Sequence, residues 1–279
     1  MKSIFKFLFL AFLLPITIAA KTLPPFNYDV HQVTIPGTSS KTIVLFHGMG
    51  GNYQLANIIK GNVDINDTLV SFNFPDYGYR IGLNDPSKTA FGTINEILPA
   101  IYVLKDVIID QGKVDVDLYG FSAGGGAIIN ALGVLNSDKY DAELKKIGVS
   151  QMDKKRILDI VQKGFVILDV PLKSVSEIKD FRGPSQSYDK MMERFQANDM
   201  DPIKSIRKLT GLALNVIIFF QVPDEVLSNR DDMLFIDEFK KYNSNGITEA
   251  IFANEGGHSR MHYSLWQKYL SLRGAKVQQ

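Results

Sequence analysis

One serine of this sequence lies in a setting that favours nucleophilic chemistry. Ser122 is the central residue of Gly120-Phe121-Ser122-Ala123-Gly124, a G-x-S-x-G sequence. On a tight turn between a strand and a helix, such a serine projects its hydroxyl above the sheet, and the glycines let strand and helix approach closely. The first amides of the helix then face a developing oxyanion. The pattern also fits a packing turn or a phosphate cradle, although neither G-x-x-x-x-G-K-[ST] nor G-x-G-x-x-G occurs.

Short apolar runs alternate with longer helix-like segments along the chain, which is typical of a parallel sheet covered by helices. Val114–Tyr119 is the predicted strand before Ser122, and Ala123–Leu135 is the predicted helix after it. The other predicted strands are Val30–Ile35, Thr42–Phe46, Thr68–Phe74, Phe165–Val170, Asn215–Gln221 and Ile247–Ala253. The other predicted helices are Thr93–Gln111, Asp232–Tyr242 and His262–Leu272. We expect one α/β domain with a mostly parallel central sheet flanked by helices.

Two segments depart from this alternation. Tyr140–Lys163 is charged and helix-like, and it is interpreted as an insertion on the surface or near the site. The segment 171–209 is irregular, with one predicted helix at Tyr188–Phe195, and it is the candidate for a small cap.

Four separated pieces of the chain resemble the α/β-hydrolase fold family, and the resemblance runs from about Lys41 to the last helix. In chain order they are Val44-Leu45-Phe46-His47-Gly48-Met49-Gly50-Gly51, the turn around Ser122, the strand and loop from Val216 to Val226, and Asn254-Glu255-Gly256-Gly257-His258-Ser259. These are similar to the family's oxyanion loop, nucleophile turn, acid loop and histidine loop. The order serine, acid, histidine is the order that this family uses.

The resemblance implies that Ser122, Asp224 and His258 form a catalytic triad. A serine hydroxyl is a weak nucleophile and needs a neighbouring base, and an imidazole accepts and returns a proton near neutral pH. The acid orients that imidazole and stabilises its charged form. The resemblance also implies that the backbone N–H groups of Met49 and Ala123 bind the oxyanion.

Other residues near these motifs have competing interpretations. Glu225 adjoins Asp224, and Asp231 and Asp232 suit the start of a helix. His47 is expected to orient the oxyanion loop. His262 is expected in the first turn of the closing helix, and His31 precedes the core.

The segment Phe74-Pro75-Asp76-Tyr77-Gly78-Tyr79-Arg80 leaves the carboxyl end of a predicted strand. Loops at that end of an open α/β sheet face the site. Tyr77 and Arg80 are therefore candidates for substrate binding, Arg80 toward an anionic group. An ordinary turn with a surface arginine explains the same residues.

The first 20 residues have the layout of a secretory signal peptide. Lys2 and Lys6 precede an apolar run from Phe7 to Ala20, which is about 21 Å long as a helix and shorter than a bilayer core of roughly 30 Å. We expect export to the periplasm or the medium, a mature domain over 21–279, and no stable transmembrane anchor.

Composition excludes several classes of function. The formal net charge is +1 and no long basic run occurs, which disfavours nucleic acid as a partner. The chain contains no cysteine, so it has neither a thiolate nucleophile nor a cysteine-ligated zinc. We expect no metal and no cofactor, and the sequence does not indicate an oligomeric state.

The resemblance implies an esterase-like or lipase-like enzyme that acts on a small acyl substrate, a carboxylic ester or a related thioester or amide. An acyltransferase or a peptidase would use the same three residues. A binding protein that keeps the fold without turnover is the alternative from another class, since a fold alone does not define a function.

Overall fold

The computed structural model describes residues 26, 31–49, 51–62, 66–74, 92–174, 177, 200–254, 257–258 and 263–277. Residues 1–20, the predicted helix Tyr188–Phe195, Tyr77, Arg80 and His262 lie outside these ranges.

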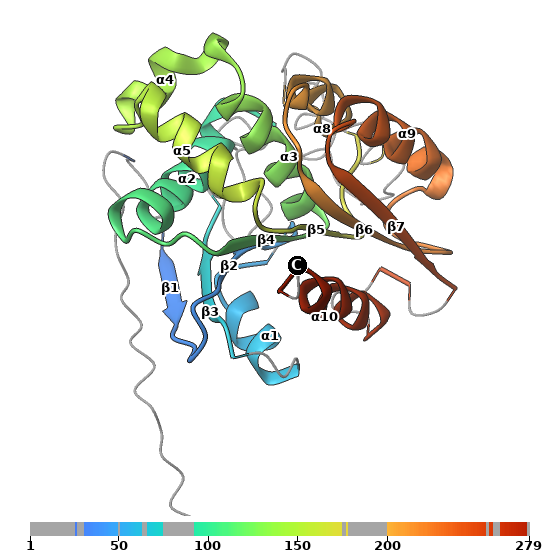
Figure 1. Ribbon diagram of the computed structural model, residues 1–279. Coiled ribbons are helices and arrows are strands. Elements are labelled where there is room, and N and C mark those ends of the chain that lie inside the picture. The colour runs from blue at the N-terminus through green and yellow to red at the C-terminus, as the bar shows by residue number, and fades with distance from the viewer. Residues whose placement is uncertain are drawn as a thin grey trace, which may run out of the picture.

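A seven-stranded sheet forms the centre of the molecule (Figure 1). Its strands, in their order across the sheet, are β1 (Gln32–Ile35), β3 (Thr68–Phe72), β2 (Thr42–Phe46), β4 (Val116–Phe121), β5 (Val166–Asp169), β6 (Asn215–Gln221) and β7 (Ile247–Ala253). Only β1 runs antiparallel to its neighbour among these seven strands, and the other pairs are parallel. The expected mostly parallel sheet is confirmed.

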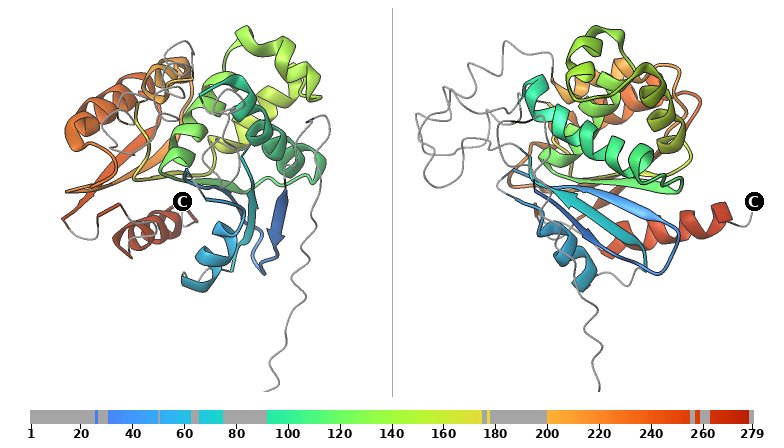
Figure 2. Two further views of the ribbon diagram at one scale, coloured as in Figure 1. Left: turned by 180° about the vertical axis from the view of Figure 1, so that it is seen from behind. Right: turned by 90° about the vertical axis from the view of Figure 1, so that its left-hand side faces the viewer.

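Helices cover both faces of the sheet, as Figures 1 and 2 show. One face carries α1 (Leu55–Asn62) and α10 (Tyr263–Val277). The other carries α2 (Ile94–Lys105) with its π-helical extension Asp106–Asp110, α3 (Ala123–Leu135), α5 (Gln151–Val161) and α9 (Asp232–Tyr242). The short helices α4 (Asp141–Lys146) and α8 (Pro202–Ser205) lie on this same side.

The central strand β2 shows why the chain buries its sheet on both faces. All five of its residues are buried. Val44 and Phe46 pack with the α2 and α3 layer, whereas Ile43 and Leu45 pack with the α1 and α10 layer. An uninterrupted apolar run is what a doubly covered parallel strand requires.

The interpretation of Tyr140–Lys163 as an insertion is wrong for its second half. Helix α5 occupies this part and buries Ile157, Ile160 and Val161 against the main core. The charged residues that suggested a peripheral segment lie mostly on its outer side, although Lys154 is buried.

Both described ends of the candidate cap pack on the main domain. The amide of Leu172 donates to the Ser122 carbonyl at 2.9 Å, and the side chain of Asn130 in α3 donates to the Met200 carbonyl at 3.1 Å. Ile206 and Leu209 belong to the main core. Apart from Glu177, the residues between these ends lie outside the described ranges, so the cap stays a prediction.

Polar contacts fix the closing helix α10 beneath the sheet. The Tyr269 hydroxyl donates to Asp117 at 2.6 Å, and the Arg273 guanidinium donates to both carboxylate oxygens of Asp67 at 2.5 and 2.8 Å. The segment that joins β7 to α10 contains His258, so these anchors hold one end of that segment.

The order of strands reverses between β2 and β4. From β2 the chain continues to β3 on one side, then crosses back to β4 and proceeds through β5, β6 and β7 on the other. In open α/β sheets, ligands bind at the carboxyl ends of the strands at such a reversal. The loop after β2 and the turn after β4 meet at this place.

Candidate active site

Ser122 occupies the turn between β4 and α3 in a conformation that few L-residues adopt. Its backbone has φ 52° and ψ −120°. The Ser122 amide donates to the Asp169 carbonyl, and its carbonyl accepts from the Leu172 amide, both at 2.9 Å. Strained backbone at a fixed turn is typical of functional sites and needs such surrounding bonds to persist.

The two glycines of the turn allow close packing at this point. A Cβ at Gly120 would lie 2.7 Å from the Gly124 carbonyl oxygen, and one at Gly124 would lie 2.1 Å from the Phe46 carbonyl oxygen. Any side chain at Gly124 would therefore separate α3 from β2. The glycine spacing is a steric requirement of the turn.

A chain of hydrogen bonds joins the three residues that the sequence motifs select. The Ser122 Oγ lies 3.1 Å from His258 Nε2, and His258 Nδ1 lies 2.8 Å from Asp224 Oδ2. An ionised carboxylate only accepts hydrogen bonds, so the proton belongs on Nδ1, and Nε2 is left to accept from the serine hydroxyl. Ser122 itself is 8% exposed.

Asp224 is held in its ionised form. Burial alone would raise the pKa of its carboxyl, but the hydrogen bond and charge of His258 together with the amides of Leu227 and Val226 outweigh it, and the pKa lies below its usual value. Both amides donate to Asp224 Oδ1 at 2.8 Å. The oxygen that faces the imidazole is therefore fixed by the bonds to the other oxygen.

The neighbouring acids have other partners. Glu225 accepts a hydrogen bond from the backbone amide of His258 at 2.9 Å. Gly257, with φ 59°, lies so close that a Cβ there would be 2.2 Å from Glu225 Oε2. Asp231 pairs with Arg230 at the surface, and Asp232 begins α9. Of these four carboxylates, Asp224 is the one that contacts the imidazole.

The loop after β2 lies directly against the serine turn. A Cβ at Gly48 would lie 3.1 Å from the Ser122 Cβ. Met49 follows in this loop, and Ala123 is the first residue of α3, where backbone amides have no partner within the helix. The structure thus brings Met49 and Ala123 to the neighbourhood of Ser122.

His47 binds backbone atoms with both ring nitrogens. Its Nε2 accepts from the Phe74 amide at 3.1 Å, so Nδ1 carries the proton and donates to the Gly48 carbonyl at 2.8 Å. These bonds tie the loop after β2 to the end of β3, in agreement with the expected role in orienting the loop. His31 lies just before the edge strand β1.

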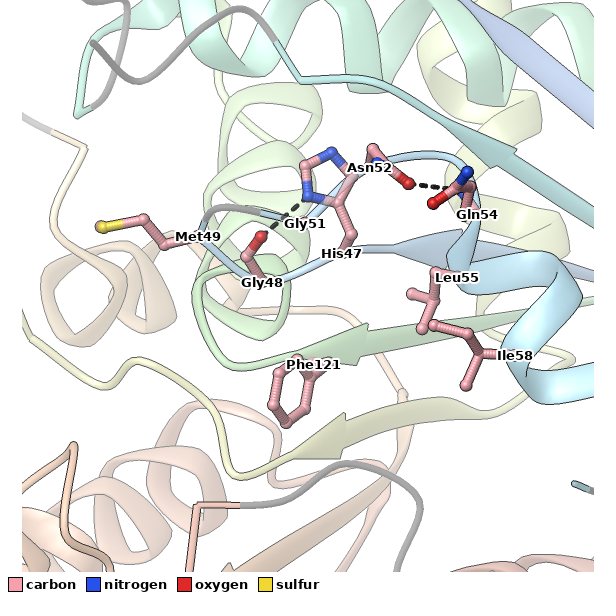
Figure 3. A pocket seen from close by; sticks show the side chains of 9 residues that line it. All are labelled: His47, Gly48, Met49, Gly51, Asn52, Gln54, Leu55, Ile58 and Phe121. Carbon is pink, nitrogen blue, oxygen red and sulfur yellow. Dashed lines mark hydrogen bonds between the residues drawn. The ribbon is translucent and has the colours of Figure 1, made fainter. Parts of the chain in front are cut away.

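A pocket of about 290 Å³ opens beside this loop (Figure 3). Its lining residues are His47, Gly48, Met49, Gly51, Asn52, Gln54, Leu55, Ile58 and Phe121. Figure 3 shows Leu55 and Ile58 projecting from α1 and Phe121 projecting from the end of β4. The Phe121 ring also packs on the His258 ring, with centroids 5.3 Å apart. Phe121 thus contacts both the pocket and the imidazole of His258.

Within the described ranges, no cluster of three or more His, Cys, Asp or Glu residues is arranged to hold a metal ion. No helix among the described residues is long and apolar enough to span a bilayer.

Several residues that shape the site were missed by sequence reasoning. Asn229 contacts the backbone of Asp224, and Lys173 pairs with Asp232 at the start of α9. Phe121 belongs to the glycine motif, but the motif does not predict that its ring packs on His258. No local pattern marks Asn229 or Lys173, because their partners come from other segments of the fold.

Solved structures of esterases share this fold. Esterase 2 of Thermogutta terrifontis, phosphonylated by sarin, matches with a TM-score of 0.59 and 16% identity over 91% of this chain and 90% of that chain. A lipase/esterase of Lactobacillus plantarum matches with a TM-score of 0.59 and 14% identity over 92% and 96%. An acetyl ester-xyloside bifunctional hydrolase of Caldicellulosiruptor lactoaceticus gives 0.56 and 15% over 91% and 92%.

No protein-family model matches the sequence, and no curated protein matches it. At 14–16% identity, the likeness to these solved structures defines the fold, which is the α/β-hydrolase fold over about nine tenths of the chain.

Proposed function

We propose that the protein is a serine hydrolase that cleaves carboxylic esters through an acyl-enzyme intermediate. The observation that carries this proposal is the chain of hydrogen bonds from Asp224 through His258 to Ser122, on a turn that strains the serine backbone. The fold shared with esterases of three bacteria supports it.

The first half of the reaction follows from this geometry. Ser122 Oγ attacks the ester carbonyl carbon while its proton passes to His258 Nε2, and the carbonyl oxygen becomes an oxyanion. In this proposal the oxyanion binds the amides of Met49 and Ala123. When the intermediate collapses, the carbon–oxygen bond to the leaving group breaks and His258 returns the proton to it, so an alcohol departs.

In the second half, water replaces the alcohol. His258 removes a proton from the water as it attacks the acyl-enzyme, and the same proton then returns to Ser122 Oγ as the carboxylic acid leaves. Asp224 keeps the imidazole in the required tautomer in both halves. A thioester or an amide would follow the same steps with a different leaving group, and an acyltransferase would replace water by another acceptor.

The pocket beside the loop after β2 favours a small acyl group. Its volume of about 290 Å³ lies just below the roughly 300–1,000 Å³ that small-molecule sites span. Its walls combine the apolar Leu55, Ile58 and Phe121 with polar edges. The pocket lies on the side of the loop after β2, whereas the leaving group must face His258 to receive its proton. We therefore assign it to the acyl part of the substrate. A T. terrifontis esterase of this fold has been solved with butyrate bound.

Tyr77 and Arg80 stay candidates for the remaining substrate contacts. Export also belongs to the proposal, and it rests on the charge and apolar pattern of residues 1–20. Sequencing the N-terminus of the protein recovered from the periplasm or medium tests it, because removal of the signal peptide gives a chain that begins near Lys21.

Replacement of the nucleophile tests the proposed function. Ser122→Ala should lower the hydrolysis of p-nitrophenyl butyrate by several orders of magnitude and abolish labelling by a fluorophosphonate probe. Ser71→Ala, at a buried serine of β3, serves as the control and should keep both. Parental rates in Ser122→Ala would refute the mechanism. A parent that neither turns over esters nor reacts with the probe would favour a binding protein.

A further inference from the structure

A buried lysine lies behind the candidate acid loop. Lys173 is 2% exposed, and its Nζ lies 2.7 Å from Glu177 Oε1 and 2.8 Å from Asp232 Oδ1. Both carboxylates are buried as well. Burial raises the pKa of the Glu177 carboxyl above its usual value, and Lys173 opposes that shift. Lysine is almost never fully buried without such partners, because the desolvation of its charge is costly.

Asn229 connects this ion cluster to the candidate acid. Its Oδ1 accepts from the Asp224 amide at 3.0 Å. Its Nδ2 donates to Asp232 Oδ2 and to the Gln221 carbonyl, each at 2.9 Å. One amide group thus joins the end of β6, the start of α9 and the backbone of Asp224. Both of its N–H bonds and its carbonyl are in use.

These contacts close into a ring that passes through the candidate site. The Leu172 amide donates to the Ser122 carbonyl and thereby supports the serine turn. Lys173 is the next residue in the sequence. From Lys173 the ring continues through Asp232 and Asn229 to the Asp224 amide, and it returns through His258 to Ser122. The distance between the serine turn and the acid loop is therefore set by side chains that do not face the substrate.

We propose that Lys173, Asp232 and Asn229 are positioning residues that hold Asp224 and His258 in register with Ser122. This inference rests on the proposed hydrolase function of the same site. Stability alone is a weak reason for such a cluster, since well-packed apolar residues replace buried ion pairs at little or no cost in stability. Geometry is a better reason, because an error of about 1 Å in a reacting group lowers a rate by about 10²-fold.

Two substitutions and a matched control test the positioning role. Asn229→Ala removes the links to Asp224 and Asp232, and Lys173→Met removes the cation at nearly constant length. Lys154→Met is the control. Lys154, on α5, is also buried, and its Nζ pairs with Asp141 of α4 at 2.6 Å. We expect kcat for p-nitrophenyl butyrate to fall by about 10–100-fold in the first two variants, with KM within about twofold, and to stay within about twofold in the control.

Proton NMR gives a readout that does not need turnover. The proton between His258 Nδ1 and Asp224 should give a downfield signal that disappears in Asp224→Ala. We expect this signal to shift or broaden in Asn229→Ala and Lys173→Met but not in Lys154→Met. If Lys173→Met fails to fold, Asn229→Ala, at the half-buried first residue of the short 3-10 helix Asn229–Asp231, carries the test.

The outcomes separate this inference from the proposed function. If the parent is labelled at Ser122 while both variants keep parental kcat and an unshifted signal, the positioning role is wrong and the hydrolase assignment stands. An equal loss of kcat in Lys154→Met would also overturn it, since the effect would then reflect stability. If the parent shows no esterase activity, the proposed function fails, and the NMR signal alone decides whether the three residues position the imidazole.

Discussion

Replacing Asp224 by Asn tests which nitrogen of the His258 imidazole must carry the proton. Asp224 Oδ1 accepts two backbone amides, from Val226 and Leu227. In Asp224→Asn only the amide oxygen can accept from these donors, so it must take that place. The NH₂ group is then left facing His258 Nδ1.

This orientation forces the wrong tautomer of the imidazole. Two donors cannot face each other, so Nδ1 must lose its proton and accept from the asparagine. The proton then lies on Nε2, which donates to Ser122 and cannot act as its base. A change of this kind in a serine protease lowers kcat by about 10⁴-fold, equal to about 5.5 kcal/mol of transition-state stabilisation. We expect a loss of that order in a variant that remains folded.

The assay compares kcat for p-nitrophenyl butyrate and Tm by circular dichroism in the parent and the variant. Glu225→Gln is the control, because its carbonyl can still accept from the His258 amide and the residue is exposed. It should stay within about threefold of the parent. A folded Asp224→Asn that loses less than about 10²-fold in kcat would refute the tautomer argument.

Three other predictions concern packing, pH and substrate size. Gly124→Ala should destabilise the protein by about 3 kcal/mol or more in urea unfolding, because its Cβ would lie 2.1 Å from the Phe46 carbonyl oxygen. Gly61→Ala in α1 is the control: its Cβ would meet no atom within 4 Å, so the substitution should be neutral or stabilising. Since the pKa of Asp224 lies below its ordinary value of 3.8, its charge stabilises the fold above that pH and the benefit is lost as the pH falls through the folded value. The unfolding free energies of the parent and of Asp224→Asn should therefore converge on acidification, and a constant difference would contradict this. Ile58→Trp should fill the pocket and lower kcat/KM for butyrate and longer acyl esters more than for acetate; an effect that instead follows the alcohol would reassign the pocket to the leaving group.

Much of the sheet could be predicted from the sequence because its strands are short, β-branched and apolar. The bounds of β2, β6 and β7 agree with the predicted ranges Thr42–Phe46, Asn215–Gln221 and Ile247–Ala253. Helices α3 and α9 also agree. In β2, β6 and α3 local propensity and burial point in the same direction, so the pattern alone suffices, whereas β7 buries only Ala253.

Helix α5 shows where composition misleads. Its sequence carries Lys154, Lys155 and Arg156 in succession, which suggests a solvated surface segment. The apolar residues one turn later nevertheless reach the core, and Lys154 itself is buried by pairing with Asp141. Pairing of this kind depends on an acid from another element. The charge of a single residue therefore does not determine its burial.

The candidate site also contains residues that a local motif predicts and residues that no local motif predicts. Ser122, Asp224 and His258 each follow a strand and lie in a short motif, and the resemblance of these motifs to the α/β-hydrolase family, in their chain order, selects them. Asn229 and Lys173 have no such motif. Lys173 meets Asp232 only because the segment after β5 and the start of α9 come together in the folded chain, 59 positions apart in sequence. A single sequence holds no signal for that pair.

The two adjacent acids explain why the imidazole has a defined orientation. Asp224 and Glu225 are adjacent in the sequence, and each one reaches a different atom of His258. The shorter side chain binds the ring at Nδ1, and the longer one binds the backbone amide of the same residue. A ring held at one nitrogen alone could still rotate with its loop. Because the backbone is held as well, Nε2 stays directed at Ser122, and Gly257 is required so that Glu225 can come close enough. Asp224 and Glu225 are therefore not interchangeable: the orientation of the base depends on both, and its tautomer depends on Asp224.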